Sequence, residues 1–242
     1  RNELHYLMNK KCDVLTLDIQ KELAVNLQYV EKNGVPQVEL FMHDYFFHAT
    51  HINDFCEMIF DKCRDSKHSI KKVISTLKTR DLGKGFCARD SMLMFRKQPG
   101  TIFRDNKMLL LDVFELCRDH SIDLDSTVKR QIRLHLDLID PAFLREPKVK
   151  EFLLALLNHP KSDKVLHIMH EAGVLGKILP EFGQTHCMVY YDFYHRYTAD
   201  EHSLRMVRFL EGLEGDREIG ELSVLSEGVC GRGSKSGWRL KL

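Results

Sequence analysis

The sequence predicts a mainly α-helical fold that carries one small β-hairpin as an insert. Three observations lead to this prediction: apolar residues recur at spacings of three and four in most segments, glycine and proline separate those segments, and one short stretch has the pattern of two strands around a turn. The chain has 242 residues, of which 43% are hydrophobic and 29% are charged, so it can bury a core without disulfide bonds. No internal repeat is visible.

The predicted elements follow from these signals in chain order. An Asn-Gly pair at 33–34 ends a first helix, and Pro36 opens a long second one, because proline at the first helical position gives up no hydrogen bond. The predicted helices span residues 15–27, 36–64, 69–79, 107–119, 125–138 and 148–157. Residues 92–95 and 101–103 flank a Gln-Pro-Gly turn and are predicted to pair as the hairpin.

A helix stop and a rigid loop are predicted further along the chain. Gly173 follows four apolar residues that share one helix face, which is where a left-handed glycine commonly ends a helix. Pro180 has no amide hydrogen to donate and disfavours a helical residue before it. Residues 176–183 are therefore predicted to form an ordered loop.

A new helix is predicted to begin directly after Thr198. Thr198 and Glu201 have the three-residue spacing of a capping box, in which each side chain bonds a backbone amide of the other residue. On this helix His202, Met206 and Phe209 fall at i, i+4 and i+7, so the imidazole is predicted to point inward with apolar side chains. Such a histidine, taken alone, is more often a hydrogen-bonded core residue than a metal ligand.

Six short segments, in one order along residues 1 to about 210, carry a resemblance to a known family. They are DVLTLDIQ at 13–20, ELFMHDYF at 39–46, IDPAF at 139–143, GVLG at 173–176, PEF at 180–182 and HRYTADEH at 195–202. Together they resemble the bacterial bifunctional PII uridylyltransferase/uridylyl-removing enzymes. Several unlinked matches in one order are more specific than any one of them.

The resemblance implies a function and a division of the chain. In the family a nucleotidyltransferase domain moves UMP from UTP to a tyrosine of the PII signalling protein, an HD hydrolase domain removes it, and C-terminal ACT domains sense glutamine. The resemblance assigns residues 1–185 to the helical region between the two catalytic domains and 186–212 to the start of the HD domain. Residues 213–242 have no helical period and are interpreted as an irregular tail, truncated or non-native.

The family's catalytic signatures are incomplete in this sequence. The Gly-Ser pair and two aspartates of the nucleotidyltransferase have no counterpart. An HD site needs a first histidine, a later His-Asp pair and a further aspartate to hold a divalent cation, Mg²⁺ or Mn²⁺. By resemblance His202 is the candidate first ligand, but no histidine follows it and Asp216 is the only later aspartate. The isolated chain is therefore expected to bind metal weakly and to catalyse neither reaction, with Glu201 as a cap rather than a catalyst.

The remaining histidines and cysteines are interpreted as ordinary residues. The His43-Asp44 pair precedes His202 and lies on the solvated face of its predicted helix, opposite a packed side that includes Phe41 and Ile52. Two histidine pairs have an i, i+3 spacing that can bind zinc but lack a nearby third ligand: His48/His51 and His167/His170. The seven cysteines are odd in number and form no CxxC motif, which indicates reduced thiols in a cytoplasmic protein.

Composition limits the partners, and three alternatives remain. The net charge of +1 gives no electrostatic reason for a nucleic-acid or membrane partner, no apolar run approaches the ~20 residues of a membrane span, and no signal peptide is visible. The expected partner is the PII protein, with UTP and glutamine bound by other domains. The alternatives are a non-catalytic helical interaction module, a stand-alone HD phosphohydrolase, and the glutamine synthetase adenylyltransferase family, against which the DEH segment argues.

Overall fold

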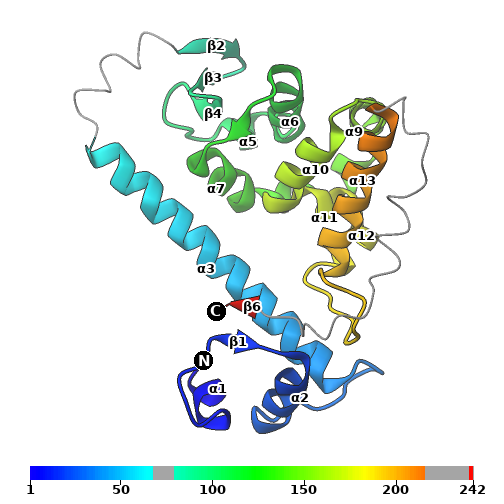
Figure 1. Ribbon diagram of the computed structural model, residues 1–242. Helices are drawn as coiled ribbons and strands as arrows, with labels where there is room; N and C mark the ends of the chain where they lie inside the picture. Colours follow the sequence, from blue (N-terminus) through cyan, green and yellow to red (C-terminus); the bar gives the residue numbers. More distant parts are fainter. Residues whose placement is uncertain (68–78, 216–239, 242) are drawn as a thin grey trace. The chain divides into compact units, whose positions relative to one another are not determined.

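The computed structural model describes residues 1–67, 79–215 and 240–241, and it is mainly helical (Figure 1). The chain divides into two compact units: residues 1–50 together with 185–242, and residues 51–184. The predicted helix at 69–79 falls almost entirely outside the described residues, and so does most of the tail at 213–242. Within the described ranges no helix combines the length and the apolar character that a membrane span needs.

The first unit joins elements from both ends of the chain. Its elements are α1 (Asn2–Leu7), β1 (Val14–Leu15), α2 (Leu17–Asn26), the first part of α3 (Gln37–Lys67), α13 (Ala199–Gly215) and β6 (Leu240–Lys241). The predicted first helix is confirmed as α2. It begins two residues later than expected because Val14 and Leu15 pair antiparallel with β6.

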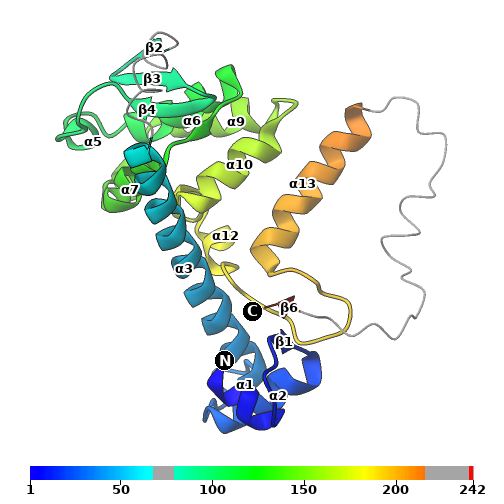
Figure 2. The same cartoon turned by 60° about the vertical axis from the view of Figure 1, so that its left-hand side comes forward.

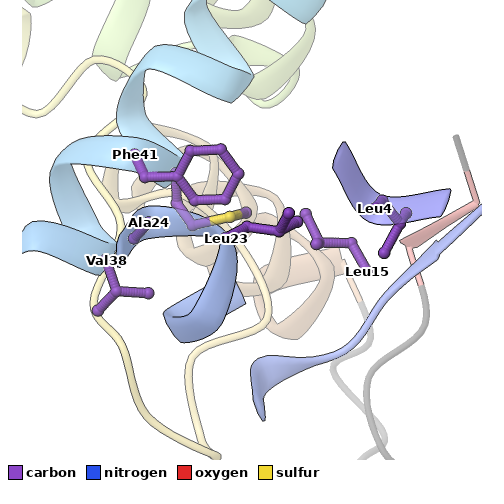
Figure 3. Close-up of a cluster of buried hydrophobic side chains, with 7 residues drawn as sticks. Leu4, Leu15, Leu23, Ala24, Val38 and Phe41 are labelled. Carbon is purple, nitrogen blue, oxygen red and sulfur yellow. The ribbon is translucent and has the colours of Figure 1, made fainter. Parts of the chain in front are cut away.

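A cluster of buried apolar side chains holds α1, β1, α2 and α3 together (Figure 3). Its buried members are Leu4, Leu15, Leu23, Ala24, Val38, Phe41 and Met42. The last three lie at i, i+3 and i+4 on α3, so they form one helix face. The packed side predicted for α3 is thus confirmed in its first half. In its second half it is wrong, because Ile52 and Phe60 are 64% exposed.

Tyr191 connects the segment before α13 to the same unit. Its hydroxyl donates to the carbonyl oxygen of Leu17 at 3.0 Å, and its backbone amide donates to Glu39 Oε1 at 3.0 Å. The ring of Tyr191 also packs against the buried cluster. These contacts position the loop that leads into α13.

The second unit contains a four-stranded sheet, whose longer strands lie side by side in Figure 2. Its strands are β2 (Arg80–Gly83), β3 (Phe86–Arg89), β4 (Met92–Phe95) and β5 (Asp123–Leu124), in the order β2-β3-β4-β5. β2, β3 and β4 are antiparallel neighbours, and β5 adds parallel to β4. The small β insert is thus confirmed.

The predicted partner of β4 is wrong. Residues 102–105 form the short helix α5 (Ile102–Asp105), and β4 pairs instead with β3. The connection is a two-residue turn at Asp90 and Ser91, which have φ of 49° and 62°. Positive φ at both turn positions matches the twist of a tight hairpin, so this turn determines the pairing.

Helices make up the rest of this unit. They are α6 (Leu109–His120), α7 (Ser126–Leu134), α8 (Pro141–Leu144), α9 (Pro147–Leu157), α10 (Ser162–Glu171), α11 (Val174–Ile178) and α12 (Pro180–Gln184), with a 3₁₀ turn, η2, at Leu136–Leu138. The three predicted helices in this region are confirmed as α6, α7 with η2, and α9. α6 is the most buried of them, because Leu110, Val113 and Phe114 are fully inaccessible.

Asp112 on α6 is a buried charge with two cationic partners. It is 3% exposed, forms an ion pair with Lys84 at 2.9 Å and accepts a hydrogen bond from Lys148 of α9. Burial by itself would raise the pKa of this carboxyl, but the hydrogen bonds from Lys148 and Lys84 outweigh it and hold the pKa below its usual value. The carboxylate therefore ties the β2–β3 turn and α9 to α6.

The region after α10 is more helical than predicted. Gly173 has a φ of 79°, so its predicted left-handed conformation is confirmed. Residues 176–183, predicted as a loop, lie mostly in α11 and α12, which are interrupted at Leu179 directly before Pro180. The two short helices touch at Gly176 and Gly183, where a Cβ built on Gly183 would lie 2.6 Å from the Gly176 carbonyl oxygen.

Replacement of Gly183 by alanine is expected to destabilise the chain by about 1–2 kcal/mol, because the new methyl group meets backbone rather than a movable side chain. Gly212 on α13 is the matched control, since a Cβ there meets nothing within 4 Å. Alanine at 212 should leave stability unchanged or raise it by up to about 1 kcal/mol through helix propensity. Thermal unfolding followed by circular dichroism checks both changes, and equal melting temperatures for the two variants would contradict the close contact.

Candidate functional site

The start of α13 forms where the sequence predicts it. The helix begins at Ala199, and the amide of His202 donates to the Thr198 carbonyl oxygen at 2.8 Å as the first helical bond. The amide of Ala199 donates to the Met188 carbonyl oxygen at 2.9 Å, which joins the helix to the preceding loop. Glu201, predicted as a cap, forms an ion pair with Arg205 at 2.6 Å.

Asp200 is the buried polar centre of this region. It is 2% exposed, and its Oδ2 accepts from His186 Nδ1 at 2.9 Å and from the Cys187 amide at 3.1 Å. Its Oδ1 accepts from the Glu201 amide at 2.9 Å. The two bonds to Oδ2 fix the first turn of α13 to residues 186–187, and the third lies within that turn.

His186 is the charged partner of Asp200. The hydrogen bond with Asp200, supported by a weaker one between Nε2 and Cys187 Sγ at 3.5 Å, raises the pKa of His186 to about 10. The pair is therefore an ion pair at neutral pH. The sequence did not predict this ion pair, because its only local indication is an aspartate in the first turn of a predicted helix.

His202 does not point inward, so that prediction is wrong. Its ring is exposed, and Met206 is 48% exposed. The buried side of α13 carries Asp200 and Leu204, of which the latter is 2% exposed. Apolar residues occur on more than one side of this helix, and a carboxylate takes an inward position, so hydrophobic spacing identified the wrong face.

A second carboxylate–histidine pair lies in the loop before α13. Asp192 Oδ1 accepts from the amides of Tyr194 and His195, both at 2.8 Å, and its Oδ2 lies 2.6 Å from His195 Nδ1. Slight burial would raise the pKa of Asp192, but the bonds from His195 and Tyr194 hold it below its usual value. The ring of His195 is thus held by a carboxylate that also organises its own backbone.

His195 and His202 are neighbours. Their ring centroids lie 6.4 Å apart with the planes at 81°, an edge-to-face arrangement. Both residues are exposed. The loop also presents Phe193 and Tyr194, which are 73% and 88% exposed, and the Arg205 guanidinium lies 4.0 Å from the Tyr197 ring centroid. The two imidazoles are therefore neighbours and both are accessible to solvent.

The other histidines named in the sequence lie on helices. His43 bonds to Asp44 at 3.2 Å and stacks on Phe47, while His48 and His51 are exposed. His167 Nδ1 lies 2.8 Å from the Asp163 carbonyl oxygen, and His170 packs edge-on against Phe182. The cysteines of the described residues are all free thiols, of which Cys87, Cys117 and Cys187 are buried and Cys56 and Cys63 are exposed.

Comparisons with known proteins cover most of the chain. The family model described as GlnD PII-uridylyltransferase matches residues 1–60, and the one described as Uridylyltransferase GlnD third domain matches residues 86–178. The second match falls within the unit that contains the sheet and α6 to α12. No solved structure matches the chain.

Curated relatives align with nearly the whole chain. The bifunctional uridylyltransferase/uridylyl-removing enzyme of Azospirillum brasilense is 29% identical over 233 residues, which cover 94% of this chain and 25% of the relative. Enzymes of the same name from Rhodospirillum rubrum and Erythrobacter litoralis are each 30% identical to this chain. Each alignment includes 88% of this chain, but only 23% of the Rhodospirillum rubrum enzyme and 24% of the Erythrobacter litoralis enzyme. The chain thus spans about a quarter of the length of these relatives. Matches that run in one order from residue 1 to beyond residue 178 show that the chain belongs to the family of bifunctional uridylyltransferase/uridylyl-removing enzymes.

Proposed function

We propose that this chain is the helical region and the beginning of the hydrolase domain of an enzyme that adds UMP to the PII signalling protein and removes it in response to glutamine. The name shared by its relatives supports the chemistry, and the matches at 1–60 and 86–178 support the assignment of the helical region. The observation that carries the proposal is the alignment of about nine-tenths of the chain with one part of these enzymes.

His202 is the residue that we propose for the uridylyl-removing reaction. Its exposed imidazole stands in the first turns of α13, on a backbone fixed by the buried Asp200. An accessible imidazole nitrogen is a suitable ligand for a divalent transition-metal ion. Such an ion, when bound, would activate water for attack on the phosphodiester that links UMP to PII. In this proposal the chain itself contributes the ligand and its orientation.

The role of His202 can be tested in a chimera of the Rhodospirillum rubrum relative, in which the matched region is replaced by this chain. His202→Ala is expected to reduce the release of UMP from uridylylated PII more than about 100-fold, because loss of a metal ligand costs several kcal/mol of transition-state stabilisation. Transfer of UMP to PII should remain. The readout is radiolabelled UMP gained and lost by PII.

His48→Ala is the control, since His48 is an exposed histidine on α3. It is expected to leave both activities unchanged. Full removal of UMP by the His202→Ala chimera would contradict the assignment. If no substitution in this region lowered either the transfer or the removal of UMP, a non-catalytic interaction module would be favoured. The 242-residue chain alone is expected to release no UMP.

A further inference from the structure

We infer that two copies of this chain associate through the second half of α3, whose helices pair antiparallel around a twofold axis. The surface that pairs is the apolar face of α3, which comprises Ile52, Phe55, Cys56, Ile59, Phe60 and Cys63. All six residues belong to the unit formed by residues 51–184. Association of this kind goes beyond the proposed function and does not depend on it.

The apolar face of α3 is exposed although it has the composition of a buried helix face. Ile52 and Phe60 are each 64% exposed. Phe55 is 58% exposed and Ile59 is 41% exposed, and the two cysteines of the face are exposed as well. Single apolar residues on a surface are ordinary, but six on one helix face form a contiguous patch, which is typical of an interaction surface.

The polar side of the same helix segment is the side that contacts its own unit. Asp54 forms an ion pair with Arg133 of α7 at 2.7 Å, and Glu57 lies 3.7 Å from Lys129 of α7. Because successive residues of an α-helix are about 100° apart, Asp54 and Glu57 lie on the side opposite the apolar face. This arrangement reverses that of an ordinary surface helix, and it leaves the apolar face directed toward solvent.

The spacing of the apolar face favours a second copy as the partner. Its members follow one another at intervals of three, one, three, one and three residues, a pattern that reads the same in both directions. A twofold axis requires such a pattern, because each patch then meets its own copy. An antiparallel copy centred between residues 57 and 58 therefore places every member opposite another one: Ile52 opposite Cys63, Phe55 opposite Phe60, and Cys56 opposite Ile59.

The size of the apolar face suits a weak and reversible dimer. At the exposed fractions given above, its side chains present on the order of 500 Å² per copy. Two copies therefore bury about 1,000 Å², which lies at the low end of specific protein interfaces. None of the six residues is an acid or a base, so pairing buries no charge of the face itself. We expect a dissociation constant of about 10–100 µM.

Sedimentation of the 242-residue chain under reducing conditions, at about 5 to 200 µM, measures the association. The unaltered chain is expected to form a dimer as its concentration rises. Phe55→Glu and Phe60→Glu should each raise the dissociation constant more than about tenfold, because each places a charge inside the apolar contact. Both side chains are exposed in the single chain, so both variants should fold as before.

Leu154→Glu is the matched control, since Leu154 is 52% exposed on α9 of the same unit and lies outside the apolar face. It should leave the dissociation constant unchanged. A chain that stays monomeric at every concentration overturns the inference and leaves the face to a different partner. A dimer that is as stable with Phe55→Glu and Phe60→Glu as without them overturns it too, because the contact then lies elsewhere.

The two cysteines of the apolar face test the antiparallel register. With a rise of about 1.5 Å per residue, the two copies of Cys56 lie about 4–5 Å apart along the helix axis, and the two copies of Cys63 about 16–17 Å apart. Only the first pair is within reach of a disulfide bond. After air oxidation catalysed by copper phenanthroline, Cys63→Ser should form a dimer linked through Cys56, identified by mass spectrometry of the linked peptides. Cys56→Ser should form no dimer linked through Cys63, and equal yields of the two linkages would overturn the antiparallel pairing.

Discussion

Replacement of Phe114 by alanine is expected to lower the free energy of unfolding by about 3–5 kcal/mol, the largest effect of any substitution considered for this chain. Phe114 lies in the middle of α6 and is fully inaccessible to solvent. Leu110, Leu111 and Val113 on the same helix are equally buried, so the surrounding side chains are packed on all sides and cannot collapse into the space left behind. Part of the cost is therefore the cavity itself.

Urea denaturation followed by circular dichroism at several temperatures measures this effect. Leu154→Ala on α9 is the control, since Leu154 is 52% exposed and should lose less than about 1 kcal/mol. A Phe114→Ala chain that unfolds at nearly the same urea concentration as the unaltered chain would show that α6 does not form the core of its unit.

Replacement of Asp200 by alanine is expected to cost about 2–3 kcal/mol of stability. The carboxylate accepts hydrogen bonds from His186, Cys187 and Glu201, and its removal leaves the buried Cys187 amide without this acceptor. His186 is 41% exposed, so its charge regains hydration and its share of the cost is small. Asp119→Ala is the control, because Asp119 forms an exposed ion pair that is worth about 0–1 kcal/mol.

The contribution of the Asp200–His186 pair should depend on pH in a defined direction. The pKa of His186 is raised to about 10 in the folded chain, against 6.5 without the partner. The stabilisation is therefore complete below pH 6.5, declines as the pH rises, and is lost above about pH 10. Asp200→Asn should be less stable than the unaltered chain at pH 6, and the difference should shrink by about 1–2 kcal/mol, after solvent screening, between pH 6 and pH 10.5. If the melting temperatures of the two chains differed by the same amount at both pH values, the predicted contribution of the Asp200–His186 ion pair would be contradicted.

Local signals in the sequence predicted most of the helices. Periodicity and helix-end residues located α2, α6 and α9, the start of α13 and the left-handed Gly173, because these features depend on residues within one or two turns. The strand partner was missed. It depends on the backbone at Asp90 and Ser91, neither of which is the glycine or asparagine that normally marks a tight hairpin.

The candidate site was predicted only in part. The segment around His202 was identified, but its orientation was not, because Asp200 takes the inward position that an apolar residue would normally occupy. The bond between Asp200 and His186 joins residues 14 positions apart across an irregular loop, and no periodicity describes such a pairing. The Asp192–His195 pair was also missed, since it depends on the conformation of a loop rather than on a helix pattern.

The attachment of Tyr191 to Leu17 and Glu39 has a consequence for dividing these enzymes into separately expressed pieces. A piece that began at residue 186 would keep Tyr191 but lose the carbonyl oxygen, the carboxylate and the apolar cluster that hold it. The segment before α13 is therefore held in place by residues far away in the sequence, since 152 positions separate Tyr191 from Glu39. Expression of Glu39 and Tyr191 on separate chains would therefore divide one compact unit.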